Sequence, residues 1–203
     1  MIYRLLITIV ALASLYFIYD IARAYSLRNN LYNAGPGFYI GADDPDVTIV
    51  KFFDYSCAGC RSSHPVFMDY FKSLPEDGPK VRYIPRPVYS TNNSGILAGR
   101  MAYAASMQGK FIEAHEWLMR NPLPIDESAA VQMARELALD YNKLRVDMDN
   151  PNVEMLLKTN GDVNLRIGSA SVPTFYVEGL TWVVGPRTVS VQDFENIVNE
   201  AMQ

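Results

Sequence analysis

The spacing of apolar residues predicts a strand, a helix and a second strand early in the chain. Val47–Phe53 (VTIVKFF) is nearly continuous in apolar and β-branched residues, which is typical of a strand buried on both faces. Apolar residues then recur at helical spacing until Pro75, where a helix is expected to stop. Val81–Ile84 has the composition of another strand, which Pro85 and Pro87 are expected to end. Together these elements form a βαβ unit.

The rest of the chain predicts a helical insert followed by a hairpin and a last helix. Between residues 94 and 167 the apolar spacing is helical, with no strand signal, so we place an insert at about residues 92–167. Val172–Val177 and Trp182–Val184 then have the composition of a hairpin. Val191–Met202 is predicted to be an amphipathic helix. The sequence thus indicates an α/β domain over residues 41–203.

The N-terminal residues 1–24 have a different character from the domain. An uncharged, strongly apolar run extends from Leu5 to Tyr19, after Arg4 and before Asp20, as in an export or membrane signal. Because a basic residue precedes the run and most of the chain follows it, the domain is expected outside the cytoplasm, in the periplasm or its equivalent. Residues 25–40 are expected to form a tether with one short edge strand near residues 38–40.

Two interpretations of this N-terminal segment remain open. Ala22-Arg23-Ala24 has the small-x-small form of a signal-peptidase site, and cleavage there would release a chain that starts at Tyr25. Tyr16, Phe17 and Tyr19, however, cluster where an aromatic belt would meet the far membrane interface. This second pattern favours an uncleaved anchor that uses residues 5–19.

Composition narrows the function classes further. The chain has 203 residues, 49% of them hydrophobic and 20% charged, which fits one globular domain. A net charge of -4 with both signs mixed along the chain gives no basic stripe, so nucleic acid is not an expected partner. The two cysteines are separated by two residues, so no framework of structural disulfides is expected.

The cysteine pair carries the chemistry that we predict. Cys57-Ala58-Gly59-Cys60 follows the first strand and opens the first helix of the domain. Unpaired backbone N–H groups and the helix dipole at that position stabilise a thiolate, so Cys57 is expected to be the nucleophile and Cys60 the resolving partner. Ala58 and Gly59 carry no charge that would tune the pair. A disulfide between the two cysteines needs no other cofactor for thiol–disulfide exchange.

A metal-binding module is the alternative use of the same pair. His64, four residues after Cys60, could join the two thiols as a third ligand. One helix does not supply a fourth group on that side, so no metal is predicted. His115 is expected to be an ordinary helix residue of the insert.

Several motifs together make the chain resemble the DsbA-like thioredoxin-fold oxidoreductases. The resemblance covers the domain from about Gly41 to the C-terminus and rests on these segments: Val47–Cys60, His64-Pro65, Gln108–Phe111 with His115, and Ser171–Gly179. It implies a thioredoxin-like fold with a helical insertion, a solvent-facing Cys57, a buried Cys60, and a cis Pro173 beside them. It also implies bacterial origin, pairing of the Val172 backbone with exported polypeptide substrates, and regeneration by a membrane quinone-linked or a thiol-reducing redox partner.

Two departures from the family pattern leave the direction of the reaction open. Lys51 stands where many members carry an acidic residue under the active-site helix; if it points toward the cysteines, its charge would stabilise the thiolate and make the disulfide more oxidising. Ala58-Gly59 replaces the Pro-His of strongly oxidising relatives. The resemblance favours oxidation of substrates, because Val172 precedes Pro173, as in oxidising relatives, and because no dimerisation domain of the kind that isomerases carry precedes the catalytic domain. Isomerase and reductase roles remain alternatives.

Overall fold

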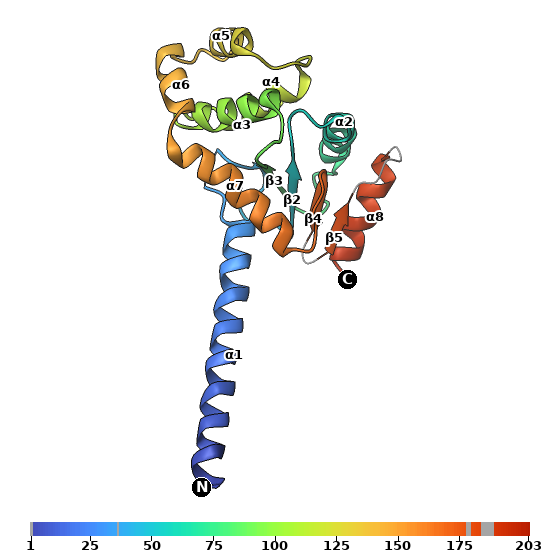
Figure 1. The fold of residues 1–203 in the computed structure, drawn as a ribbon. Helices are drawn as coiled ribbons and strands as arrows, with labels where there is room; N and C mark the ends of the chain where they lie inside the picture. The colour runs from blue at the N-terminus through green and yellow to red at the C-terminus, as the bar shows by residue number, and fades with distance from the viewer. Residues whose placement is uncertain (1, 36, 178–179, 184–188) are drawn as a thin grey trace. The chain divides into compact units, whose positions relative to one another are not determined.

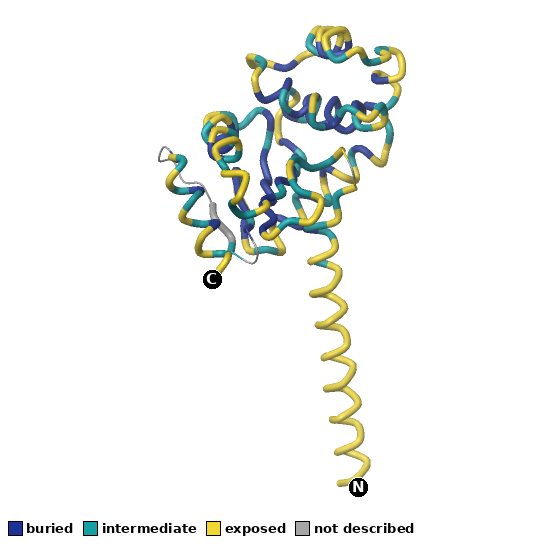
Figure 2. Tube along the Cα trace, turned by 180° about the vertical axis from the view of Figure 1, so that it is seen from behind, coloured by how far each residue is buried: buried dark blue, intermediate teal, exposed yellow. Residues whose placement is uncertain are grey.

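The protein is described by a computed structural model that covers residues 2–35, 37–177, 180–183 and 189–203. The chain divides into two compact units, residues 1–33 and residues 34–203. The first unit is a single helix, α1 (Ile2–Tyr32), whose residues 2–26 are all exposed (Figure 2). It is long and apolar enough to cross a membrane, a test that a signal sequence at this position would also pass.

Helix α1 extends further than the sequence pattern suggested. Residues 25–32, which were expected to belong to a tether, continue the helix without a break. No glycine or proline occurs before Gly35, so nothing in this stretch stops a helix from propagating. The expected edge strand is present but shifted by two residues, as β1 (Ile40–Gly41).

The second unit is built on a five-stranded mixed sheet in the order β1-β3-β2-β4-β5 (Figure 1). Its central strand, β2 (Val47–Phe53), is buried at all seven positions, as its continuous apolar pattern predicted. β2 runs parallel to β3 (Val81–Pro87) and antiparallel to β4 (Thr174–Val177), and β4 pairs with β5 (Leu180–Val183).

Strand β3 continues through two prolines that were expected to end it. Pro85 and Pro87 lie opposite Lys51 and Phe53 in the parallel ladder. On its other side β3 pairs with β1 at Arg82 and Tyr83 alone. Beyond these residues no described strand lies along the outer edge of β3, so a proline that lacks an N–H leaves no ladder bond unmade there.

Helices cover both faces of the sheet. Helix α2 (Ala58–Ser73) and helix α8 (Val191–Ala201) pack on the face that carries Ile49 and Phe175, where Phe67 and Phe194 meet the sheet in one apolar cluster. Helix α7 (Pro151–Arg166) covers the opposite face of β2 and β3 (Figure 1).

The predicted helical insert is present. It contains α3 (Asn93–Ser106), α4 (Phe111–Arg120), α5 (Glu127–Glu136) and α6 (Tyr141–Met148), followed by α7. These first four helices gather beyond the C-terminal end of β2, so the insert borders the start of α2 (Figure 1). The predicted hairpin corresponds to β4 and β5, although Gly179 and Val184 of the sequence pattern lie outside the described residues.

Candidate active site

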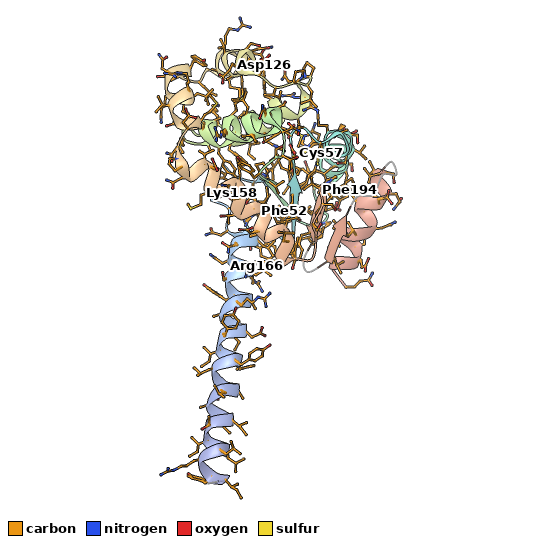
Figure 3. All side chains as sticks on the ribbon, in the orientation of Figure 1. Phe52, Cys57, Asp126, Lys158, Arg166 and Phe194 are labelled. Carbon is orange, nitrogen blue, oxygen red and sulfur yellow. The ribbon has the colours of Figure 1, made fainter. Side chains whose placement is uncertain are left out.

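Cys57 is the N-cap residue of α2, which places its sulfur among the free N–H groups of the first helical turn. Its backbone is extended, and its Sγ accepts a hydrogen bond from the backbone N–H of Cys60 at 3.3 Å. The chain reaches this position directly from β2 through a turn in which the Cys57 N–H donates to the carbonyl oxygen of Asp54 at 3.1 Å. The expected strand-to-helix junction is therefore present (Figure 3).

The two cysteines have opposite acid–base properties. Hydrogen bonding from the side chain of Cys60, together with the backbone N–H groups of Cys60 and Gly59, lowers the pKa of Cys57 to about 6 even though partial burial opposes ionisation. Burial, followed by the neighbouring Cys57, raises the pKa of the Cys60 thiol far above its usual range. Both cysteines are free thiols in this structure. Cys57 is half-buried and Cys60 fully buried, so one sulfur can meet a substrate and the other cannot.

The loop that contains Pro173 lies against the nucleophile. The Val172–Pro173 peptide bond is cis, as the resemblance implied, and the Cys57 Sγ lies 3.8 Å from the carbonyl oxygen of Val172. Gly59 also borders this contact: a Cβ added there would make ordinary van der Waals contacts, 3.6 Å from the Pro173 ring and 3.9 Å from the Cys57 sulfur. Ala58 and Gly59 form the first turn of α2 and bring no charge to the site.

A hydrogen-bonded cluster that the sequence analysis missed fixes the turn before Cys57. The carboxylate of Asp54 accepts hydrogen bonds from the backbone N–H and the hydroxyl of Ser56, both at 2.8 Å, and from the hydroxyl of Ser90 at 2.7 Å. Asn92 donates from its side-chain amide to the Ser56 hydroxyl at 2.7 Å. The sequence did contain a signal for this cluster. An aspartate two residues before a serine, just after a buried strand, is typical of a side chain that accepts a hydrogen bond from the backbone N–H two residues further on.

Lys51 lies on the same face of β2 as Ile49, the face that α2 covers. Its Nζ donates to the backbone carbonyl oxygen of Cys60 at 3.4 Å, and its side chain is 0% exposed. The rings of Phe175 and Phe53 lie 5.3 and 5.8 Å from the ammonium. Desolvation lowers the pKa of Lys51 to about 8, opposed by the charges of Cys60, Glu116 and Cys57. Alternation along the strand did not determine which way the Lys51 side chain points. In the structure it points toward the cysteines.

Two histidines and a carboxylate form a second buried cluster behind the cysteines. His64 of α2 and Glu116 of α4 approach within 3.2 Å, and the rings of His64 and His115 are 5.1 Å apart in a T-shaped arrangement. The two nitrogens of His115 face the hydroxyls of Tyr55 and Tyr83, at 3.2 and 3.3 Å. His115, expected to be an ordinary helix residue, is a fully buried member of this network.

This cluster also has the composition of a metal site, but its contacts argue against one. Ligand atoms of His64, His115 and Glu116 lie within 4.8 Å of one another. Both nitrogens of His115 are already engaged by tyrosine hydroxyls, and the charge of Lys51 acts on both histidines. A cation would therefore have to displace hydrogen bonds and tolerate a buried ammonium, so we assign no metal to these residues.

A cavity of about 570 Å³ opens beside the loop that contains Pro173. Helix α7 supplies Lys158 and Leu165, the segment after β3 supplies Tyr89, and Val172 and Asp54 connect the cavity to the surroundings of Cys57. Its lining combines apolar and charged side chains.

A family model described as thioredoxin matches residues 33–199 of the chain. The chain belongs to this family. Among solved structures, a thioredoxin-like oxidoreductase from Silicibacter pomeroyi DSS-3 is 30% identical, with a TM-score of 0.73 over 86% of this chain and 96% of that one. The predicted family and fold class are therefore confirmed.

More distant structures share the same fold. The thiol-disulfide exchange protein alpha-DsbA2 from Wolbachia pipientis is 17% identical, with a TM-score of 0.71 over 88% of this chain and 94% of that one. A periplasmic thioredoxin-like protein from Salmonella enterica serovar Typhimurium is 22% identical, with a TM-score of 0.66 over 87% of this chain and 95% of that one. At these identities the two structures show that the fold is shared.

Curated relatives match the chain over only part of their own length. The Na(+)/H(+) antiporter NhaA from Herminiimonas arsenicoxydans is 27% identical over 139 residues, which are 68% of this chain and 22% of the antiporter. The chain thus spans about a fifth of that protein, and the antiport activity of the whole relative is not carried over to it.

Proposed function

We propose that the protein is an extracytoplasmic thiol–disulfide oxidoreductase that oxidises cysteine pairs of exported polypeptides through Cys57 and Cys60. The observation that carries this proposal is the asymmetry of the pair. Cys57 is half-buried at a helix N-terminus with a pKa lowered to about 6, whereas Cys60 is 0% exposed with a raised pKa. Such a pair suits a nucleophile and a resolving thiol that act in turn.

The reaction consists of two exchanges. A substrate thiolate attacks the Cys57 sulfur of the oxidised protein; the bond between Cys57 and Cys60 breaks, and its electron pair goes to the Cys60 sulfur. A second substrate thiolate then attacks the substrate sulfur of the mixed disulfide, and Cys57 leaves as a thiolate. The substrate loses two electrons and the protein gains them. Because Cys57 ionises easily, it is a good leaving group, which favours transfer of the disulfide to the substrate.

The surroundings of Cys57 support a polypeptide substrate. The carbonyl oxygen of Val172, next to Pro173, can accept a hydrogen bond from the backbone of an extended segment that adds to this edge. The adjacent cavity offers room for flanking side chains. Lys51, whose ammonium lies under the first turn of α2, adds positive charge near both sulfurs and favours the reduced form.

We also propose that α1 anchors the domain to the inner membrane. Its 31 residues give a length of roughly 46 Å, more than the hydrocarbon core of about 30 Å. The helix continues across residues 22–24, where a signal peptidase would have to cut. A membrane quinone-linked protein is the regenerating partner consistent with this placement. N-terminal sequencing of the full-length protein from bacterial membranes tests the anchor; a chain that starts at Tyr25 would refute it.

Oxidative refolding of a reduced, unfolded protein that has several cysteines tests the proposed activity. The oxidised protein should restore native disulfides stoichiometrically, and the Cys57→Ser variant should restore none. The redox potential of the pair, measured against glutathione, separates the alternatives. A strongly oxidising value supports the oxidase role, and a low value would assign the protein to the reductases. Stoichiometric zinc or copper in the purified protein, with no exchange at all, would identify a metal-binding module instead.

A further inference from the structure

An unsatisfied hydrogen-bond acceptor lies in the wall of the cavity beside Pro173. Asn164 of α7 lines this cavity and is 4% exposed. Its Nδ2 donates to the carbonyl oxygen of Ser171 at 3.0 Å, and because a carbonyl oxygen only accepts, this bond fixes which end of the amide is the acceptor. That acceptor, Oδ1, is buried and has no hydrogen-bond partner among the residues that the structure describes. A donor that enters the cavity would satisfy it.

Two carboxylates bring negative charge to the same cavity. Asp162 of α7 lines it, is exposed, and takes part in no ion pair within the described part of the chain. Asp54 lines it at the end nearest the nucleophile, and its charge acts on Cys57. The hydrogen bonds that Asp54 accepts come from two serine hydroxyls and a backbone N–H, which are neutral groups, so they leave its charge in place.

Lys158 of α7 is the only cation among the described residues that line the cavity (Figure 3), and its charge is already balanced. Its Nζ lies 2.6 Å from a carboxylate oxygen of Glu154, which does not line this cavity. Glu154 also contacts Arg100, and Arg100 contacts Asp149, so this network contains two cations and two carboxylates. The charges of Asp54 and Asp162 therefore remain uncompensated, and the cavity has a net negative charge.

The cavity lies within reach of the residues that flank a substrate cysteine. Val172 lines it, and the carbonyl oxygen of Val172 is 3.8 Å from the Cys57 sulfur. Successive residues of an extended segment are about 3.3 Å apart, so a long side chain up to three residues from the bonded cysteine can enter. An arginine side chain has N–H donors, no acceptor and a positive charge, which match the unsatisfied acceptor and the two carboxylates. A glutamate side chain would add like charge and no donor.

We propose that this cavity selects substrate polypeptides with an arginine or lysine within three residues of the cysteine that attacks Cys57, and that Asp162 determines this preference. The inference rests on the proposed function and deepens it by naming the substrate class. Asp162, at the exposed end, attracts the cationic side chain, and Asp54 and Asn164 supply further acceptors. The preference acts on association of the substrate, before any sulfur is exchanged, so the disulfide chemistry at Cys57 is the same for every substrate.

The test is the rate at which the oxidised full-length protein oxidises three short peptides at neutral pH. Each peptide has two cysteines separated by two small residues, and the same residue, arginine, glutamine or glutamate, stands outside both cysteines. At low salt the arginine peptide should react about tenfold faster than the glutamate peptide, with the glutamine peptide between them. The ratio should shrink as salt is added, because the attraction involves partly exposed charges.

Asp162→Asn removes one carboxylate from the cavity wall at nearly constant volume. The ratio of the arginine rate to the glutamate rate should fall by about two- to fivefold. Asp77→Asn is the matched control, since it makes the same change in net charge at an exposed residue outside the cavity lining, before the start of β3. This control should keep the wild-type ratio. Because every variant meets the same peptides, the effect of the flanking residue on the peptide thiols cancels when the ratios are compared.

Three results separate the inference from the proposed function. Equal ratios in Asp162→Asn and Asp77→Asn would overturn the role of Asp162. A wild-type protein that oxidises all three peptides at the same rate, or the glutamate peptide fastest, would overturn the preference for basic substrates while leaving the oxidase role intact. If the wild type oxidises none of the peptides at any salt concentration, the proposed function itself fails.

Discussion

The sulfur of Cys57 lies 3.8 Å from the carbonyl oxygen of Val172, although 115 residues separate them in the chain. The contact exists because β2 and β4 are antiparallel neighbours in the sheet. The segment after β2, which contains Cys57, and the segment before β4, which contains Val172, therefore meet at the same end of the sheet. A substrate backbone that pairs with Val172 would thus present its sulfur to Cys57. Sheet topology, rather than local sequence, builds the site.

Replacing Cys60 should leave a reactive but unresolved nucleophile. In Cys60→Ala the first cause of the low pKa of Cys57, hydrogen bonding from the Cys60 side chain, is lost, so the pKa of Cys57 should rise from about 6 toward its ordinary value. The backbone N–H groups of Gly59 and Cys60 remain, so the rise should be incomplete. Thiolate absorbance during a pH titration measures it. Cys60→Ala should also trap substrates as stable mixed disulfides, and failure to trap any would contradict the assigned order of the two cysteines.

Removing the charge of Asp54 should lower the pKa of Cys57 further. The carboxylate is the nearby anion that raises this pKa, so in Asp54→Asn the thiolate should form at lower pH than in the wild type. The substitution is compatible with the loop, because the Ser90 hydroxyl that now donates to the carboxylate can accept from an amide instead. Asp44→Asn, in an exposed turn, is the control. A pKa that rises in Asp54→Asn would show that loop geometry outweighs charge here.

The stability of the reduced protein should depend on the ionisation of Cys57. Its pKa in the folded state, about 6, is lower than the ordinary value of 9.0. The stabilisation from its thiolate is therefore fully present above pH 9 and is lost as pH falls through about 6. Urea unfolding of the reduced protein against Cys57→Ser, at pH values across this window, measures the difference. The two proteins should converge at the acid end, and a constant gap would contradict the lowered pKa.

Features that depend on the spacing of residues within one segment could be predicted from the sequence, whereas contacts between distant segments required the structure. Val47–Phe53 and the position of Cys57 before α2 could be predicted because each depends on spacing within one segment. The contact of Glu116 with His64 could not, since it joins helices from two parts of the chain and no spacing within one segment indicates it. The orientation of Lys51 also required the structure, because both faces of β2 are buried and alternation does not distinguish them.

Two glycines with opposite surroundings should respond to alanine in opposite ways. Gly161 lies inside α7 with nothing within 4 Å of an added Cβ, so Gly161→Ala should stabilise the protein by about 1 kcal/mol.

Gly95, in the first turn of α3, is the contrasting position. A Cβ there would lie 2.2 Å from the Ser90 hydroxyl and 2.5 Å from the Asp54 carboxylate, so Gly95→Ala should destabilise by about 1–3 kcal/mol. Urea midpoints measure both variants. Because Gly95→Ala displaces Asp54, it should also shift the titration of Cys57, whereas Gly161→Ala should not. An unchanged titration in Gly95→Ala would mean that the Asp54 cluster does not control the turn that presents the nucleophile.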